Sequence, residues 1–376
     1  MKIINYMKKL LFFFLVAASM CSEAQYFIST AKDATTNDGV VYFLPRNVLK
    51  IELTVKETNY YVGPYAEYAR SVFGTDDYIS ENKTKYEVQS VDVQIFSQSD
   101  PDASYCVWLD EKSKEHGTLE FSMTDDGVIR SFGGNVSAED VDINYITVNQ
   151  DVITTKVNKQ DVHFMNFIEP EREPEENEEG EMVAPKELTK EDKAKLIVEN
   201  INNIRNLYRD LVSGFQEVSY GNTLNDMAVK TKNIENEYVS LFVGKEEIYT
   251  HKKAFYITPE AKDKNGMVII AKISENEGVV NASSKNGTAI KIQFETAEPI
   301  VACNTKVDTD GENPIINNKL FYRIPASSST KIYCGNDILA ECNLKISQFG
   351  KTMTVPINGC GILFNPNTGQ VVRIKK

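Results

Sequence analysis

A strict alternation of apolar and polar residues runs from Leu49 to Lys56. Leucine, isoleucine, leucine and valine alternate with lysine, glutamate, threonine and lysine over these positions. A period of two residues predicts a β-strand with one buried face and one solvated face. The pattern therefore predicts sheet structure in the first part of the chain.

The same period of two returns in later parts of the chain. Residues 86–95 repeat it with a phase change at Ser90–Val91, which predicts a β-bulge. From about Tyr249 onward, short alternating runs such as 290–294 are separated by glycine, asparagine and proline. Short strands with this punctuation favour antiparallel sheets packed as a sandwich or barrel.

A short helix is expected over residues 63–70, because Pro64 stands in its first turn and Gly74 follows its end. Four tyrosines crowd around this turn: Tyr60, Tyr61, Tyr65 and Tyr68. Exposed tyrosines stack on sugar faces or bind peptides, which makes these four the candidate ligand contacts. The alternative, which we favour, is that they pack in the core behind the first sheet.

An acidic segment follows the first group of strands. Residues 169–181 contain eight glutamates and one arginine, with prolines at 170 and 174. Like charges at this density resist compaction, so we expect a disordered linker over 169–188. A site for calcium or a cationic partner is the alternative, but glutamates without an ordered turn form no defined cage.

Two amphipathic helices are expected over residues 189–246. Thr189, with acidic residues behind it, caps the first helix, which ends at Gly214, and Gly244 ends the second. The apolar stripe of the first helix comprises Ile197, Ile201, Ile204, Leu207 and Leu211. That of the second comprises Leu224, Met227, Ala228, Ile234, Tyr238 and Leu241. These stripes predict an αα-hairpin that packs one face within the molecule, or else against a partner protein.

The fold class that follows is a β-rich α+β fold. We expect two antiparallel β-sandwich or barrel-like modules, joined by the acidic linker and the αα-hairpin. The predicted segments are an N-terminal β module with one short helix at 25–168, the linker at 169–188, the hairpin at 189–246 and a C-terminal antiparallel β module at 247–376.

Residues 1–24 have the pattern of a secretory signal peptide. Lysines precede an apolar stretch from Leu10 to Met20, and small residues precede Gln25. We expect cleavage before Gln25 and export to the periplasm or cell surface. The alternative is a lipoprotein anchored through Cys21, although Met20 is a poor residue at that position. Contact with a membrane is expected only in the lipidated form.

The mature chain would keep an odd number of cysteines: Cys106, Cys303, Cys334, Cys342 and Cys360. Their disulfide pairing is open, because pairs are possible in an exported protein and the count leaves one thiol over. Cys334 and Cys342 flank a turn at 335–337, so we expect that they could face each other across a hairpin. With no Cys-x-x-Cys and three histidines, a zinc site is not expected.

Composition and motifs exclude several classes of function. A net charge of −13 argues against sequence-independent nucleic-acid binding. After the N-terminus no apolar run approaches ~18 residues, which excludes a polytopic membrane protein. The sequence contains no nucleophile elbow, phosphate loop, dinucleotide fingerprint or zincin motif. The three histidines, His116, His163 and His251, are expected in structural roles, and Cys106 in a sheet.

One short segment is a weak candidate for calcium. Asp308, Asp310 and Asn313 surround Gly311, and alternating oxygen ligands with glycine at the turn are typical of short calcium loops. The segment lacks the bidentate glutamate that completes such a loop. A plain polar turn is the interpretation that we favour, and no catalytic residue or cofactor is predicted.

Several segments together resemble one family. VYFLP at 41–45, LKIELTV at 49–55 and YVGPYAEYA at 61–69 are similar to the opening of the uncharacterised Bacteroidetes family called domain of unknown function 4831. The helical stretches resemble its middle, and FYRIPA at 321–326 with SQFG at 347–350 its end. The resemblance implies an exported protein of a Gram-negative, Bacteroides-like bacterium. It implies no activity, cofactor or catalytic residue.

Two hypotheses for function come from different classes. The first is a non-enzymatic binding or scaffolding protein of the periplasm or cell surface, whose partner is an envelope protein or a glycan. The second is an exported hydrolase that acts on glycans through a pair of carboxylates, which the sequence alone does not identify. A cleft with two inward carboxylates would favour the hydrolase, and a shallow or aromatic-lined groove would favour the binding protein.

Overall fold

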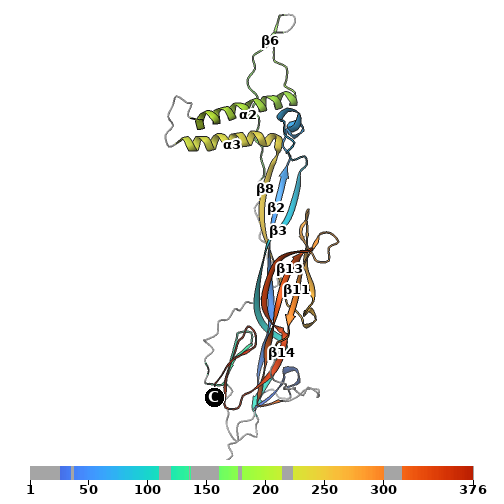
Figure 1. Ribbon diagram of the computed structural model, residues 1–376, viewed down its shortest axis with the longest axis vertical. Coiled ribbons are helices and arrows are strands. Elements are labelled where there is room, and N and C mark those ends of the chain that lie inside the picture. The colour runs from blue at the N-terminus through green and yellow to red at the C-terminus, as the bar shows by residue number, and fades with distance from the viewer. Residues whose placement is uncertain are drawn as a thin grey trace, which may run out of the picture.

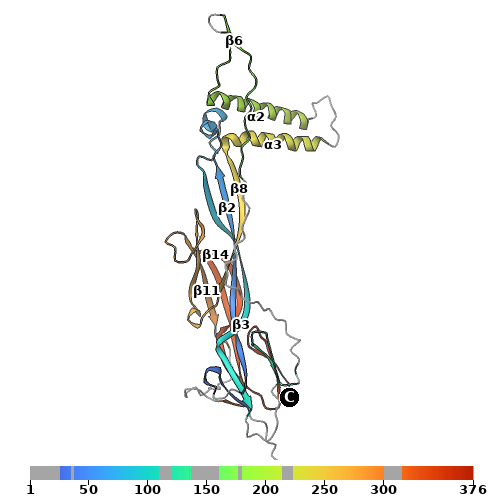
Figure 2. The ribbon, with the colours of Figure 1, turned by 180° about the vertical axis from the view of Figure 1, so that it is seen from behind.

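The computed structural model describes residues 26–34, 38–109, 120–134, 136, 161–176, 180–213, 223–299 and 316–375. The signal segment with Cys21, the calcium candidates at 308–313, Cys303 and His116 lie outside these residues. The described chain is elongated, and two helices lie across one end of a long β arm (Figure 1). The view from behind shows the same helices at the end of strands β2 and β8 (Figure 2). No helix in this part of the chain is long and apolar enough to cross a membrane.

Two long strands form the spine of the molecule. β2 spans Val40–Tyr61 and β3 spans Lys83–Leu109. β2 pairs with β3 along one edge and with β8 (Lys245–Ile257) along the other. β1 (Tyr26–Thr30) and β12 (Ile316–Asn317) extend this sheet beside the C-terminal end of β3, which gives the order β12-β1-β3-β2-β8.

Two further antiparallel sheets have four or more strands, and a two-stranded sheet lies in the acidic segment. The second sheet has the order β10-β9-β11-β13-β14, and the third has the order β16-β15-β5-β4. The strands of the second are β9 (Met267–Ser274), β10 (Gly278–Val280), β11 (Thr288–Ala297), β13 (Lys319–Cys334) and β14 (Asp337–Pro356). Those of the third are β4 (Phe121–Met123), β5 (Ile129–Phe132), β15 (Gly361–Phe364) and β16 (Val371–Lys375). Short 3-10 turns lie at η1 (Ala31–Asp33) and η6 (Ala261–Asp263).

The early and late β segments of the chain share sheets. β8 pairs with β2, β12 with β1, and β15 with β5, so each pairing joins strands from opposite sides of the helices in sequence. Sheets of this kind with a helical hairpin confirm the β-rich α+β class. The structure adds what the sequence pattern does not show, namely that strands from the early and late β segments pair within the same sheets.

The apolar residues whose alternation predicted the first strand form the core between the first and second sheets. Leu49, Ile51, Leu53 and Val55 are buried against apolar residues of the second sheet, among them Ile292. Each large side chain buried in this way contributes about 1.5–3 kcal/mol relative to exposure. A second core lies at the end away from the helices, and it joins Ile28, Tyr42, Leu44, Ile129, Leu320, Ile362 and Phe364.

The predicted bulge is present. Thr54 pairs with Ser90 and Val55 with Val88, so Gln89 is the extra residue on β3. The bulge lies one residue before the expected phase change. It explains why the apolar side chains of β3 change parity at this point.

The helical end is built around a third core. Two short turns, the 3-10 turn η2 (Ala66–Tyr68) and the π-helical turn η3 (Ala69–Phe73), replace the single short helix that was expected. They pack against α2 (Lys190–Ser213) and α3 (Leu224–Val243). The buried residues of this core are Ala69, Ala194, Ile197, Ile201, Leu241 and Phe242.

The start of α2 has the predicted cap. The Thr189 hydroxyl accepts a hydrogen bond from the Asp192 backbone at 3.2 Å, and the Asp192 carboxylate accepts one from the Thr189 backbone at 3.2 Å. This reciprocal pair is a capping box, which satisfies two backbone donors at the helix start.

The predicted apolar stripes are buried only in part. Ile197, Ile201, Leu211 and Leu241 are buried, and Ile204, Met227 and Tyr238 are half-buried. Leu207, Leu224 and Ile234 are exposed. Ile197, Ile201 and Leu241 belong to the third core beside η3, whereas Leu211 is buried near the far end of α2. The hairpin projects sideways from the arm (Figure 1).

An ion pair at the buried carboxylate of Glu235 joins the two helices, and its basic partners are themselves exposed. Arg205 Nε donates to Glu235 Oε1 at 2.8 Å, and Lys232 Nζ donates to Glu235 Oε2 at 2.7 Å. Burial of Glu235 acts to raise the pKa of its carboxyl, but the hydrogen bonds from Arg205 and Lys232 outweigh it and lower that pKa. The contact therefore depends on a charged glutamate.

The acidic segment forms an exposed hairpin in its described residues. β6 (Glu175–Glu176) pairs with β7 (Met182–Val183), and Arg172 Nη2 donates to the Lys186 carbonyl at 2.6 Å. The segment is tied to α2 by the ion pair of Glu169 with Lys193. Its expected disorder stays a prediction.

The expected meeting of Cys334 with Cys342 is wrong. Cys334 lies opposite Asp337, because Gly335 and Asn336 alone form the turn, and Cys342 lies opposite Thr330. Cys106, Cys334, Cys342 and Cys360 are all free thiols. Cys106 is buried on β3, as its alternating neighbours predicted.

Two isoleucines of the hairpin provide a matched test of this packing. Ile201 is 0% exposed and Ile234 is 48% exposed. We predict that Ile201→Ala lowers the free energy of unfolding by about 2–5 kcal/mol, because it leaves a cavity in the third core. Ile234→Ala should change it by less than about 1 kcal/mol. Thermal and urea unfolding measure both, and equal effects would contradict the described packing.

Candidate functional site

An open cleft lies where the β arm meets the helical end. Its volume is about 490 Å³, which is within the range of small-molecule sites. Residues from β2, β3, the loop between Gly74 and Asn82, and the junction of α3 with β8 line it. Four segments that are far apart in sequence therefore meet at this cleft.

Strands β2, β3 and β8 form a three-stranded arm, and its solvent face is the floor of the cleft. Tyr60 on β2 stands between Lys83 on β3 and Glu246 on β8. In the next row on the same face, Thr58 stands between Lys85 and Ile248. The Lys83 ammonium lies 5.6 Å from the centroid of the Tyr60 ring, in a cation–π contact.

The wall of the cleft is the loop that follows η3, and hydrogen bonds hold it at three places. Thr75 N donates to the Ala69 carbonyl at 2.9 Å, and Ile79 N donates to the Val243 carbonyl at 2.9 Å. At the end of the loop, Val62 N donates to Asn82 Oδ1 at 2.7 Å. The cleft is therefore formed by fixed backbone, and this backbone places the half-exposed ring of Tyr78 at its side.

Gly244 allows the loop to approach the arm closely. Its φ of 92° and ψ of −174° lie in a region open essentially to glycine. A Cβ at this position would lie 2.4 Å from the Tyr61 carbonyl oxygen and 2.9 Å from Ile79 Cδ1. A side chain here would therefore push the loop away from the arm.

The charges of the residues that line the cleft are balanced. Lys83 and Lys85 contribute ammonium groups, and Asp77 and Glu246 contribute carboxylates. The formal charges of the described lining residues therefore cancel, although the whole chain carries −13. All four belong to exposed residues, and the Lys83 ammonium also lies 3.8 Å from a carboxylate oxygen of Glu81, which is outside the lining.

The opposite face of the arm carries a buried polar chain. Glu57 is 1% exposed, and its Oε2 lies 2.6 Å from His251 Nε2. Asn59 Nδ2 donates to Glu57 Oε1 at 2.9 Å, and Thr84 Oγ1 donates to Asn59 Oδ1 at 2.6 Å. These contacts cross all three strands of the arm and leave Glu57 shielded from solvent. His251 therefore serves to pair a buried carboxylate.

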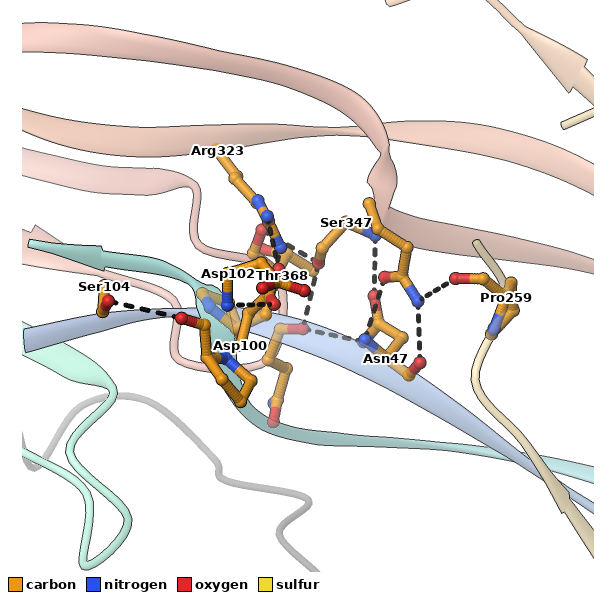
Figure 3. Close-up of polar contacts among 12 residues, drawn as sticks. Asn47, Asp100, Asp102, Ser104, Pro259, Arg323, Ser347 and Thr368 are labelled. Atoms are coloured by element: carbon orange, nitrogen blue, oxygen red, sulfur yellow. Dashed lines mark hydrogen bonds and ion pairs between the residues drawn. The ribbon is translucent and has the colours of Figure 1, made fainter. Parts of the chain in front are cut away.

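A second polar cluster joins the first two sheets in the middle of the molecule (Figure 3). Ser347 N donates to Asn47 Oδ1 at 2.7 Å, and the Gln348 amide donates to the carbonyls of Asn47 at 2.8 Å and Pro259 at 2.9 Å. Nearby, Arg323 Nη2 donates to Asp100 Oδ2 at 2.6 Å. Buried polar groups satisfied in this way fix how the sheets meet, which is a structural role.

The predicted tyrosines separate in the structure. Tyr60 lies on the cleft floor, whereas Tyr61 follows it on β2 and belongs to the opposite side of the strand. Tyr65 and Tyr68 pack against the third core at the helical end, not behind the first sheet. Sequence reasoning missed Tyr78, Lys83, Lys85 and Glu246. The alternation of Lys83, Lys85 and Glu87 on β3 was the available sign of a solvent face.

The described residues show neither a metal cluster nor a pair of buried carboxylates. No group of three or more His, Cys, Asp or Glu side chains among them could hold a metal ion. Of the carboxylates that are buried in this part of the chain, Glu57 meets His251, Asp100 meets Arg323, and Glu235 meets Arg205 and Lys232. Each faces a basic group.

Two glycines give a matched test of how the loop is held. We predict that Gly244→Ala lowers the melting temperature and opens the loop to proteases, because both strain, about 1–3 kcal/mol, and collision oppose the side chain. Gly74 also has a positive φ, of 82°, but a Cβ added there would meet nothing within 4 Å. Gly74→Ala should therefore cost only about 1–2 kcal/mol and leave proteolysis unchanged. Equal proteolysis of the two variants would contradict the role of Gly244.

Comparison with known proteins places the chain in a family without an assigned activity. Neither curated proteins nor solved structures give a match. A family model does match, over residues 38–372, and this span includes the cleft and most of the three cores. The chain therefore belongs to the family described as Domain of unknown function (DUF4831), as the resemblance in sequence predicted.

Proposed function

We propose that the chain is an exported, non-enzymatic binding protein of the cell envelope, and that the cleft at the helical end is its binding site. The observation that carries the proposal is the cleft itself. It has aromatic and charged side chains from four segments, and its loop is tied to the arm by backbone hydrogen bonds. A site formed in advance loses little entropy when a ligand binds.

The shape of the molecule supports a role in display. β1, which follows the predicted cleavage position, pairs with β3 at Tyr105–Leu109, and the cleft lies at the other end of β3, beside Lys83. At about 3.3 Å per residue, a strand of this length spans up to about 85 Å. In the lipidated alternative, a chain anchored through Cys21 would therefore present the cleft far from the membrane.

The carboxylates favour binding over hydrolysis. A glycosidase needs a general acid whose pKa is raised, usually by burial, next to a second carboxylate. Asp77 and Glu246 at the cleft are exposed. The buried carboxylates of the described chain are each paired with a basic group. These features support the binding hypothesis over the alternative of a hydrolase.

The proposal is tested by sedimentation of the purified chain, without its first 24 residues, with envelope fractions of its host. We expect the chain to sediment with the envelope and to release no reducing sugar from it. The double variant Tyr78→Ala with Lys85→Ala should lose most of this binding. Lys252→Ala is the matched control, because Lys252 lies on the same face of the arm but bonds to Glu52 away from the cleft.

Two results would contradict the proposal. One is release of reducing ends that disappears when Asp77 or Glu246 is replaced by its amide, which would establish a hydrolase. The other is a wild-type chain that stays in the supernatant with every envelope fraction.

A further inference from the structure

We propose that the cleft binds a neutral sugar, with the ring of Tyr78 as the surface on which the sugar stacks. This inference rests on the proposed function and specifies its ligand. It is carried by three features of the cleft, namely one ring that is open to a ligand, a balanced set of charges and a suitable volume.

Tyr78 is the aromatic ring available for stacking. It is 37% exposed, and its neighbour Ile79 is bonded to the Val243 carbonyl, so the ring is accessible and the backbone that carries it is held in place. Tyr60 differs, because the Lys83 ammonium lies over its ring. An aromatic ring with a fixed backbone offers a flat apolar face to the C–H side of a pyranose at low entropic cost.

The polar groups of the cleft match hydroxyls better than they match ions. The ammonium groups of Lys83 and Lys85 only donate hydrogen bonds, and the carboxylates of Asp77 and Glu246 only accept them. A sugar hydroxyl both donates and accepts, so one polyhydroxylated ligand can bond to groups of both kinds. An anionic ligand would meet two carboxylates, and a cationic ligand would meet two ammonium groups.

The volume and form of the cleft fit a sugar. About 490 Å³ is enough for a ligand of more than one ring, and the cleft is open to solvent. The apolar part of its lining is small, with Ile79 and Val243 as its aliphatic members. A peptide ligand would need pockets for apolar side chains or a free strand edge, and the cleft lies on a sheet face.

The test uses an array of neutral and acidic glycans, followed by affinity electrophoresis in gels that contain a β-glucan, an α-mannan, a β-galactan or polygalacturonate. We expect the wild-type chain to bind neutral glycans and to be retarded by at least one neutral polysaccharide. Tyr78→Ala should weaken this binding about two- to tenfold. Tyr78→Phe keeps the ring and should retain binding, as should the control Lys252→Ala. The melting temperature confirms that each variant is folded.

Different failures have different meanings. Binding to polygalacturonate or other acidic glycans alone would overturn the neutral class. Retardation that Tyr78→Ala leaves unchanged would overturn the assignment of the cleft. If no neutral glycan binds while the chain still sediments with envelopes through the cleft, the sugar is wrong and the proposed binding function stands. If sedimentation fails as well, both are wrong.

Discussion

The double pairing of β2 is the constraint on which the rest of the structure depends. β3 pairs with β2 from Val40 to Tyr60, and β8 pairs with it from Leu49 to Tyr61. Between Leu49 and Tyr60 both backbone edges of the strand are therefore bonded, apart from the bulge at Gln89 of β3. A strand whose backbone groups are hydrogen-bonded on both edges stays ordered beyond the second sheet that covers it. The arm can therefore extend as far as the helices.

One face of β2 changes its chemistry along the strand. From Leu49 to Val55 it is apolar and packs against the second sheet, and beyond that sheet it carries Glu57 and Asn59. The pairing of Glu57 with His251 and Asn59 satisfies this polar stretch without a second apolar layer. Removal of one partner would leave a buried polar group unpaired, which costs far more than the net value of the contact.

Local signals in the sequence predicted the elements well. The alternation from Leu49 to Val55 identified the buried face of β2, and Thr189 and Gly244 marked helix ends that the structure confirms. These features depend on neighbours in sequence, since strand period and helix caps are local. The family could also be predicted from the sequence, because the similar segments occur in the same order along the chain.

Features that depend on distant neighbours could not be predicted. β8 pairs with β2, and β15 pairs with β5, although these strands are far apart in the sequence. The cleft brings Tyr60 and Glu246 together, and its more exposed ring belongs to Tyr78, whose exposure no local pattern indicates. Ile234 was assigned to the apolar stripe by its spacing, yet it is exposed, whereas the polar Thr231 and Glu235 on either side of it are among the residues that α3 buries.

β2, β3 and β8 form one continuous arm from the core between the first two sheets to the cleft. Native-state hydrogen exchange of the β2 amides tests this continuity most directly, because protection reports which backbone segments open together. We expect the amides of 56–60 to exchange as slowly as those of 49–55, in one cooperative unit. Fast, independent exchange of 56–60 would show that the arm opens separately from the core, and would contradict a fixed cleft at its end.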